Sequence, residues 1–222
     1  MGNSKDHWLQ IRKNLDVHEI RLGMSTAESY VEDPKMLGFV ASRYKFVSKL
    51  IAGTETALEV GCCDAFGVPI VAQTVGHLIC TDIDEEMIAD DQIRMKHLSN
   101  TEFRYFDFRE SRYDKSVDAI YSVDVIEHIF PEEEDRWIAN QVASLTPRGV
   151  MVIGTPNVTA NQYASPHSQA GHINLKDHKA LREIGLKFFH NVFMFSMNDE
   201  VVHTGFSPMA HYLWALCVGP RG

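Results

Sequence analysis

The sequence contains few cysteines, and none of them forms a paired motif. Four cysteines occur among 222 residues, at positions Cys62, Cys63, Cys80 and Cys217. The absence of any CxxC pair argues against a zinc ribbon or a thioredoxin-like redox site. Three of the four stand in or near apolar, strand-like runs. We therefore expect small buried hydrophobic side chains in a reducing compartment, and hence a cytoplasmic protein.

Long apolar runs and an excess of basic residues are also absent. No stretch approaches the roughly 18 apolar residues of a membrane span, and the polar start MGNSKDHWLQIRKN lacks the apolar core of a signal peptide. The 21 Lys and Arg residues are outnumbered by 30 Asp and Glu, which gives a net charge of -9. An acidic surface is poorly suited to a phosphate backbone. We expect no membrane span and no nucleic-acid partner, and the oligomeric state is left open.

Strand and helix patterns alternate through the middle of the chain. Apolar runs predict strands at 56–60, 77–83, 101–108, from 116 onward and at 150–156, and helical spacing predicts helices at 34–52, 68–75, 85–98 and 131–145. Near-continuous apolar strands of this kind form a parallel sheet covered by helices on both faces. Ligands bind such sheets beyond the carboxyl ends of the strands, near the point where the strand order reverses. We look for chemistry there.

The last third of the chain has a different character. Residues 157–173 are rich in Asn, Ser and Pro, and predict a long lid or binding loop. A helix is expected at 174–189 with Asn174 as its N-cap. Two final strands at 190–199 and 208–219, joined by a loop at 200–207, predict an antiparallel hairpin at the sheet edge.

These patterns together predict one α/β domain. Its sheet would be doubly wound, mostly parallel and seven-stranded, with an antiparallel C-terminal hairpin and an N-terminal helical segment. We divide the domain into a helical N-terminal cap (1–54), a cofactor-binding core (55–156), and a substrate loop with the last helix and two strands (157–222).

The stretch LEVGCCDAFG connects the first predicted strand to the next helix. A dinucleotide fingerprint counted from Gly61 would need glycine where Cys63 and Phe66 stand, so an NAD-dependent oxidoreductase is a rival hypothesis only. Gly61 allows backbone to approach a ligand without a Cβ in the way. Cys63 and Ala65 are small, and we expect the turn to form if neither residue needs a positive φ.

The order of these motifs resembles class I S-adenosylmethionine-dependent methyltransferases over about residues 55–155. The matching segments are LEVGCCDAFG, ICTDIDEEM, RYFDFRE and YSVDVIEHI. The resemblance implies S-adenosyl-L-methionine as the cofactor. It implies cofactor contacts by Glu59, Gly61, Cys63, Asp82, Ile83, Asp107, Phe108 and Asp124.

Among these residues, Asp82 has the clearest chemical rationale. Its carboxylate can accept hydrogen bonds from both ribose hydroxyls. Asp84 is the rival, although it is better placed to cap the helix at 85. Asp107 would face adenine, unless it is a surface residue beside a strand. Of the neighbouring Phe106 and Phe108, one could stack on adenine, and core packing is the alternative for at least one of them.

The stretch SVDVIEHI follows a buried strand and is the best place for catalytic machinery. In many small-molecule O-methyltransferases of the resembled family, a His in an EH pair lies beside the acceptor. We therefore predict that His128 takes the acceptor's proton, because imidazole titrates near neutral pH. The alternative is that Glu127 and His128 are structural.

Polar clusters outside the core predict the acceptor site. We expect substrate contacts from Tyr30, Arg43, Tyr44, Lys45, His172, Asn174, Asn198 and His203. Such side chains suit a small polar, sugar-like or phosphorylated acceptor. The C-terminal segments are similar to those of bacterial methyltransferases associated with surface polysaccharide modification.

Two further alternatives bear on function. A non-catalytic binding or scaffold protein could keep the fold, and Cys63 and Ala65 motivate that reading. His172, His203 and Asp199 could together bind a metal, but no spacing matches a compact metal motif. We therefore predict no metal site.

Overall fold

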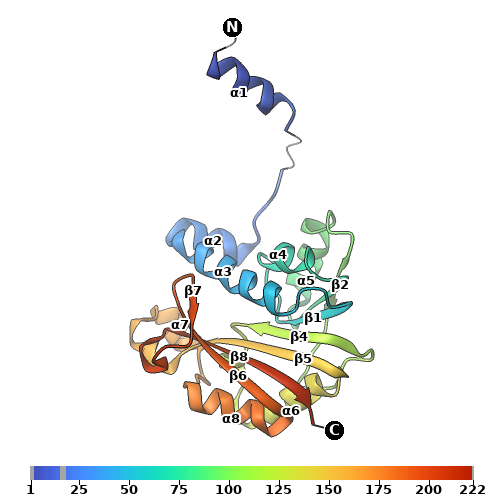
Figure 1. The fold of residues 1–222 in the computed structure, drawn as a ribbon, viewed down its shortest axis with the longest axis vertical. Helices are drawn as coiled ribbons and strands as arrows, with labels where there is room; N and C mark the ends of the chain where they lie inside the picture. Colours follow the sequence, from blue (N-terminus) through green and yellow to red (C-terminus); the bar gives the residue numbers. More distant parts are fainter. Residues whose placement is uncertain (1–2, 16–18, 222) are drawn as a thin grey trace.

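The computed structural model describes residues 3–15 and 19–221 and contains an eight-stranded sheet (Figure 1). The strands lie in the order β3-β2-β1-β4-β5-β8-β6-β7. Their bounds are β1 Thr56–Val60, β2 His77–Asp82, β3 Thr101–Tyr105, β4 Val117–Val123, β5 Leu145–Pro156, β6 Phe189–Asn198, β7 Val201–His203 and β8 Tyr212–Pro220. The pairs among β1 to β5 are parallel, and β8, β6 and β7 are joined by antiparallel pairs.

Eight α-helices and three short 3-10 helices, η1 to η3, connect the strands within the described residues. The α-helices are α1 Ser4–Lys13, α2 Met24–Glu32, α3 Lys35–Leu50, α4 Val68–Ala72, α5 Glu85–Arg94, α6 Pro131–Val142, α7 Pro166–Gly171 and α8 His178–Phe188. The 3-10 helices are η1 Ile126–His128, η2 Val158–Tyr163 and η3 Ser207–Met209. Helix α1 buries no residue and stands apart from the body in Figure 1. Within the described ranges, every helix is too short or too polar to cross a membrane.

The doubly wound α/β fold is confirmed, with corrections at the C-terminal side. The predicted loop 157–173 contains η2 and α7, and the predicted loop 200–207 contains β7, which makes the sheet eight-stranded. Strands β6 and β8 do pair antiparallel, but β8 lies between β5 and β6 instead of at the edge. Most side chains of β8 are buried. An interior strand covered on both faces suits this apolar sequence better than an edge.

Two local boundaries also differ from the prediction. Asn174 is not the N-cap of α8. That position is held by Asp177, whose Oδ1 accepts from the Ala180 backbone N–H at 2.7 Å. The Asn174 amide instead donates to Glu134 Oε2 at 2.7 Å. Strand β3 ends at Tyr105, because the chain then leaves the sheet.

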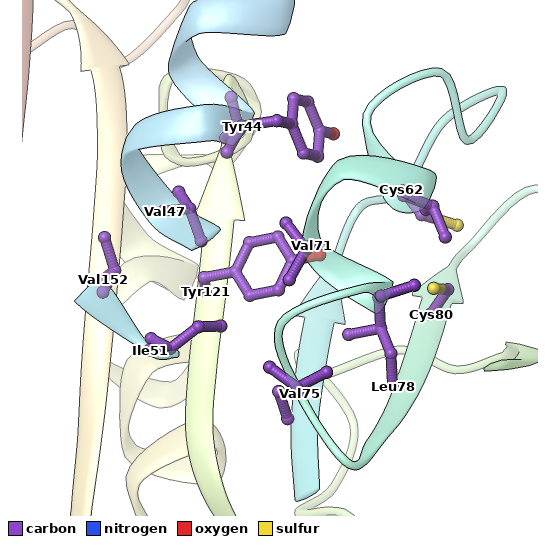
Figure 2. Close-up of a cluster of buried hydrophobic side chains, with 14 of the residues drawn as sticks. Tyr44, Val47, Ile51, Cys62, Val71, Val75, Leu78, Cys80, Tyr121 and Val152 are labelled. Carbon is purple, nitrogen blue, oxygen red and sulfur yellow. The ribbon is translucent and has the colours of Figure 1, made fainter. Parts of the chain in front are cut away.

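The sheet separates two apolar layers. Along β1, Ala57 belongs to the layer beneath α3 and α4, whereas Leu58 belongs to the layer beneath α6 and α8. Figure 2 shows the first layer, in which Tyr44, Val47 and Ile51 of α3 point toward the sheet. Their spacing places Tyr44, Val47 and the C-cap residue Ile51 on one face of the helix, in agreement with the helix predicted at 34–52.

The strand order reverses between β1 and β4. From β1 the chain proceeds outward to β2 and β3, and it then returns to place β4 on the other side of β1. Loops that leave the carboxyl ends of β1 and β4 therefore diverge to opposite faces and leave a crevice. This crevice positions the candidate site.

Close packing of α3 on the start of α4 generates a stability prediction. A Cβ built at Gly67 would overlap the buried ring of Tyr44. Gly67→Ala should therefore lower the free energy of unfolding by roughly 1–3 kcal/mol. Gly38→Ala is the matched control, since its Cβ would meet only Glu200 Oε1 at 3.5 Å. Because it lies inside α3, that variant should gain about 0.5–1 kcal/mol. Urea unfolding measures both, and equal effects would contradict the packing argument.

Candidate functional site

The turn after β1 has a left-handed backbone at three alternate positions. The φ angles are +75° at Gly61, +50° at Cys63 and +57° at Ala65. From the sequence we expected the turn to form if neither Cys63 nor Ala65 needed a positive φ, and the turn forms although both residues have one. A left-handed conformation costs an L-residue about 1–2 kcal/mol. Contacts around the turn must offset this cost.

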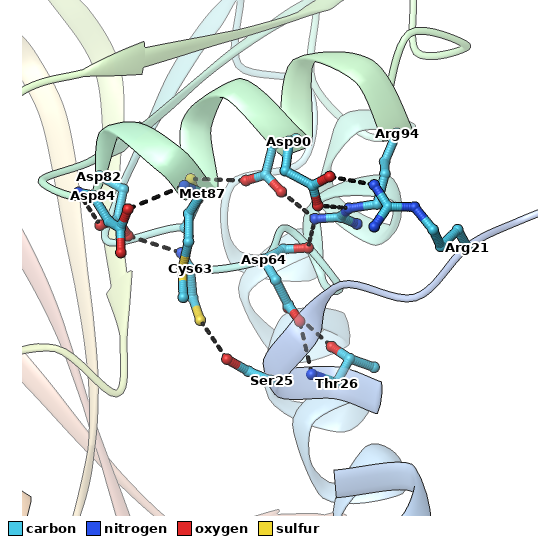
Figure 3. Close-up of polar contacts among 12 residues, drawn as sticks. Arg21, Ser25, Thr26, Cys63, Asp64, Asp82, Asp84, Met87, Asp90 and Arg94 are labelled. Carbon is cyan, nitrogen blue, oxygen red and sulfur yellow. Dashed lines mark hydrogen bonds and ion pairs between the residues drawn. The ribbon is translucent and has the colours of Figure 1, made fainter. Parts of the chain in front are cut away.

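Three neighbouring elements hold the turn (Figure 3). The Cys63 backbone N–H donates to Asp82 Oδ2 of β2 at 2.9 Å. The Asp64 carboxylate accepts from the backbone N–H and the hydroxyl of Thr26 in α2, at 2.7 and 2.9 Å. Arg94 of α5 donates to the Asp64 carbonyl oxygen at 2.7 Å. The turn is thus fastened to α2, β2 and α5.

The steric role of Gly61 differs from the one expected. A Cβ at this position would lie 2.5 Å from Cγ2 of Val125. The side chain that requires glycine here is therefore one from the loop after β4. Gly61 also lines the pocket described below.

Asp82 and Asp84 have separate roles at the end of β2. Asp84 is the N-cap of α5, and its Oδ1 accepts from the N–H groups of Glu86 and Met87 at 2.9 and 3.1 Å. Asp82 accepts one backbone N–H on each oxygen, from Cys63 and from Asp84. A carboxylate offers about four acceptor positions. Asp82 therefore can accept hydrogen bonds from two further donors. The next residue, Ile83, is 54% exposed, so its side chain is accessible to a ligand at this edge of the sheet.

Glu59 lies behind the turn and does not face the pocket. It is fully buried, and its carboxylate accepts from the hydroxyls of Tyr44 at 2.7 Å and Tyr121 at 3.0 Å. Burial raises the pKa of Glu59 to about 8, and this effect exceeds the opposite effect of the two hydroxyls. The negative charges of Asp82 and Asp91 raise it further. The placement favours a role in positioning β1, α3 and β4.

A pocket of about 210 Å³ opens beside the turn. It lies between α2, α3 and the carboxyl ends of β1 and β4. Its lining comprises Ser25, Thr26, Ser29, Met36, Leu37, Val40, Tyr44, Gly61, Cys62, Cys63, Asp64, Phe66, Gly67, Val123 and Asp124. Gly61, Cys63 and Asp124 are therefore three of the predicted cofactor residues that the structure brings together. Ser25 and Thr26 were missed, because nothing in the sequence of α2 indicates that it covers this turn.

The segment after β3 is largely structural. Asp107 accepts from Arg109 Nη2 at 2.7 Å, and this pairing lowers the pKa of its carboxyl. Phe108 is buried, and its ring packs on that of Phe106 with centroids 4.7 Å apart. Core packing is thus confirmed for Phe108. A cofactor contact by Asp107 stays a prediction.

An arginine and a carboxylate meet at the carboxyl end of β4. Arg43 Nη1 donates to Asp124 Oδ2 at 2.7 Å, and the guanidinium lies 4.1 Å from the ring centroid of Tyr212. Asp124 has a φ of +58°, and its buried Oδ1 has no hydrogen-bond partner among the described residues. Tyr212 was missed from the sequence, because it belongs to an apolar strand remote from α3 along the chain.

Glu127, His128 and His172 gather next to this pair. His128 is exposed, and its Nδ1 lies 2.9 Å from the carbonyl oxygen of Gly171. Its ring contacts that of His172 with centroids 5.2 Å apart. Glu127 is fully buried, and burial beside Asp124 raises the pKa of its carboxyl. Partial burial and His128 lower the pKa of His172.

The other predicted substrate residues do not join this group. Lys45 lines a separate hollow with Ser48 and Ile70. The His203 Nε2 lies 2.9 Å from Asn198 Oδ1, within the β6–β7 hairpin. The remaining three are Tyr30, exposed on α2; Tyr44, held by Glu59; and Asn174, held by Glu134. Of the eight residues predicted, Arg43 and His172 lie in this group through their side chains and Tyr44 lines the pocket. Substrate contact by each of the eight stays a prediction.

Comparison with known proteins agrees with this geometry. Residues 58–153 match the family model described as a methyltransferase domain. The chain is 28% identical over 115 residues to a probable S-adenosylmethionine-dependent methyltransferase of Mycolicibacterium smegmatis. This match covers 51% of the chain and 42% of that relative, so less than half of the relative's length is represented.

Over residues 58–153, the chain is similar to methyltransferase domains.

Solved structures show the same fold over the whole methyltransferase domain and its flanks. N-methyltransferase NodS from Bradyrhizobium japonicum WM9, in complex with S-adenosyl-L-homocysteine, superposes with a TM-score of 0.67 at 16% identity, and the match covers 99% of this chain and 100% of that one. The DhpI–SAH complex superposes with a TM-score of 0.64 at 17% identity, over 88% and 92% of the two chains. The family resemblance seen in the sequence is confirmed.

The positive φ at Cys63 predicts that a glycine at this position makes the protein more stable. Cys63→Gly should raise the free energy of unfolding by about 1 kcal/mol, because glycine adopts a positive φ without steric cost. Cys63→Ala keeps the Cβ and should bring no gain. The exposed thiol makes only a 3.5 Å contact with Ser25 Oγ, so little is lost by either change. Urea unfolding compares the two variants, and a Cys63→Gly protein no more stable than Cys63→Ala would contradict the strain.

The buried carboxyl of Glu59 predicts a dependence of stability on pH. Between its ordinary pKa of 4.5 and the folded value of about 8, the unfolded chain releases a proton that the folded protein keeps. Ionisation of Glu59 therefore favours unfolding, and its contribution to stability is lost as the pH rises through this window. Glu59→Gln has no such proton. Its stability relative to the natural protein should rise by roughly 3–5 kcal/mol from pH 4.5 to pH 8.

Urea unfolding at several pH values tests this expectation. Glu110→Gln, at an exposed position, is the control and should follow the natural protein at every pH. Parallel pH curves for Glu59→Gln and the natural protein would show that the carboxyl does not hold its proton.

Proposed function

We propose that the protein transfers the methyl group of S-adenosylmethionine to an oxygen atom of a small polar acceptor. The observation that carries this proposal is the pocket at the carboxyl ends of β1 and β4, which is lined by the left-handed turn. Asp82 lies next to this turn and accepts from its Cys63 N–H. The pocket of about 210 Å³ is smaller than a typical site for a whole ligand. It suits the methionine end of the cofactor, with the ribose at Asp82 and adenine beside Ile83.

The groups beyond the pocket favour one chemical class of acceptor over another. Arg43 is already paired with Asp124, so it offers little net charge to an anionic substrate. This favours a neutral hydroxyl-bearing acceptor, such as a sugar, over a phosphorylated one. One similar structure is named an N-methyltransferase. A nitrogen acceptor is therefore the second outcome to test.

The transfer itself needs little from the protein. The sulfur–methyl bond breaks with its electron pair kept by sulfur, a carbon–oxygen bond forms, and the acceptor hydroxyl gives up its proton. Alignment of the two reactants and exclusion of water supply much of the rate. We assign removal of the proton to His128, which is exposed at the end of η1 and lies against His172.

Calorimetry with S-adenosylhomocysteine tests cofactor binding. The natural protein should bind it, and Asp82→Asn should weaken binding about 10-fold to 100-fold through the loss of charge-assisted hydrogen bonds. Asp84→Asn is the matched control, because asparagine also caps a helix and the change removes the same charge two residues away. No heat at millimolar S-adenosylhomocysteine, or binding of NAD instead, would overturn the proposal.

Turnover with labelled S-adenosylmethionine and a panel of sugars and amines tests the second half of the proposal, the methyl transfer to an acceptor. His128→Ala should lower turnover at least about 100-fold while leaving cofactor affinity nearly unchanged. Cofactor binding without any labelled product in the panel would favour a non-catalytic binding protein.

A further inference from the structure

Three side chains able to ligate a metal converge beside the proposed acceptor site. Glu127 and His128 belong to η1, and His172 follows α7. One ligand atom from each lies within 4.8 Å of the others. Two hydrogen bonds join the segments, from the His128 Nδ1–H to the Gly171 carbonyl at 2.9 Å and from the Asn174 N–H to the Glu127 carbonyl at 3.0 Å. His172 is therefore held in place between two fixed residues.

The Glu127 carboxylate is left with unused acceptor capacity. Oε2 accepts from the Thr155 hydroxyl at 3.0 Å, whereas the buried Oε1 has no partner among the described residues. The nearby cation, Arg43, is paired with Asp124 at 2.7 Å. A buried carboxylate oxygen without a partner is costly. A cation at the cluster would satisfy it.

The hydrogen bonds around the cluster also orient its ligands. A carbonyl oxygen can only accept, so Nδ1 of His128 carries the proton and Nε2 keeps the lone pair. Ligating histidines commonly donate their second ring N–H to a backbone carbonyl, and ligating carboxylates are themselves hydrogen-bonded. Gly171 and Thr155 provide both of these outer contacts.

We propose that Glu127, His128 and His172 bind one divalent transition-metal ion of the zinc or cobalt type. Two imidazoles and one carboxylate match the ligand set of such ions, whereas Mg²⁺ and Ca²⁺ favour all-oxygen sites. Ligand atoms around tetrahedral zinc lie roughly 3.3 Å apart, so the cluster must contract by about 1.5 Å at most. The His172 ring, which makes no hydrogen bond among the described residues, can turn to achieve this while the His128–Gly171 bond is kept.

The functional role of the ion rests on the proposed methyl transfer. Three protein ligands leave a coordination position open, and the exposed side of His128 gives access from solvent. A hydroxyl bound at that position becomes more acidic and loses its proton more readily. With the ion bound, His128 is a ligand, and the acidified hydroxyl releases its proton to solvent water instead of to His128. From the sequence we expected no metal site, because the set considered there, His172, His203 and Asp199, matches no compact metal motif.

Titration of tag-free, chelator-treated protein with Co²⁺ tests the site directly. We expect one equivalent to bind, with the visible absorption bands of a low-symmetry Co²⁺ site, and Zn²⁺ to displace it. His172→Ala and Glu127→Gln should each weaken Co²⁺ binding at least about tenfold. His97→Ala, at an exposed histidine outside the cluster, should leave it unchanged. Circular dichroism checks that each variant is folded.

The outcomes separate this inference from the proposed function, because S-adenosylhomocysteine binding is measured on the same samples. Cofactor binding without stoichiometric Co²⁺ binding would overturn the metal site alone. Co²⁺ binding that His172→Ala leaves unchanged would also overturn it, since the ion would then lie elsewhere. Co²⁺ binding at the cluster without cofactor binding would support the metal site and contradict the methyl transfer.

Discussion

The site depends on a turn that its own residues do not favour. Cys63 and Ala65 are held at positive φ. The hydrogen bonds that fix the turn run from the Cys63 N–H to Asp82 and from Thr26 and Arg94 to Asp64. Glycine would relax the turn, whereas neighbours from α2, β2 and α5 impose its conformation. The shape of the pocket is therefore a property of the assembled domain, and it is absent from the isolated strand–turn–helix segment.

Glu59 extends this dependence into the core. Its carboxyl joins Tyr44 of α3 and Tyr121 of β4, so one polar group on β1 fixes both neighbours of the crevice. A buried polar network of this kind is favourable only when each member is satisfied. The two tyrosine hydroxyls fulfil that condition. The geometry at the carboxyl ends of β1 and β4 thus rests on apolar packing and on one shared carboxyl.

Most of the fold could be predicted because strand and helix periods are local properties of the sequence. Strand β1, helix α3 and the parallel, doubly wound character of the sheet followed from periodicity and the family resemblance. The position of β8 inside the sheet could not be predicted, because strand pairing is decided by contacts between segments that are distant along the chain. The grouping of residues near the proposed acceptor site could not be predicted for the same reason. Arg43 meets Tyr212, and His128 meets His172, through tertiary packing. Lys45 is adjacent in sequence to the pocket residue Tyr44 but lines a separate hollow.

The unequal anchoring of α2 and α3 bears on how a ligand enters and leaves. Helix α3 buries Tyr44, Val47 and Ser48, so moving it would expose the Glu59 carboxyl and a section of the core. Helix α2 buries only Thr26 and is tied to the turn through the two hydrogen bonds of that residue to Asp64. Displacement of α2 is the less costly way to open the pocket, and the same movement releases the turn. Opening of the pocket and release of the turn are therefore coupled through Asp64.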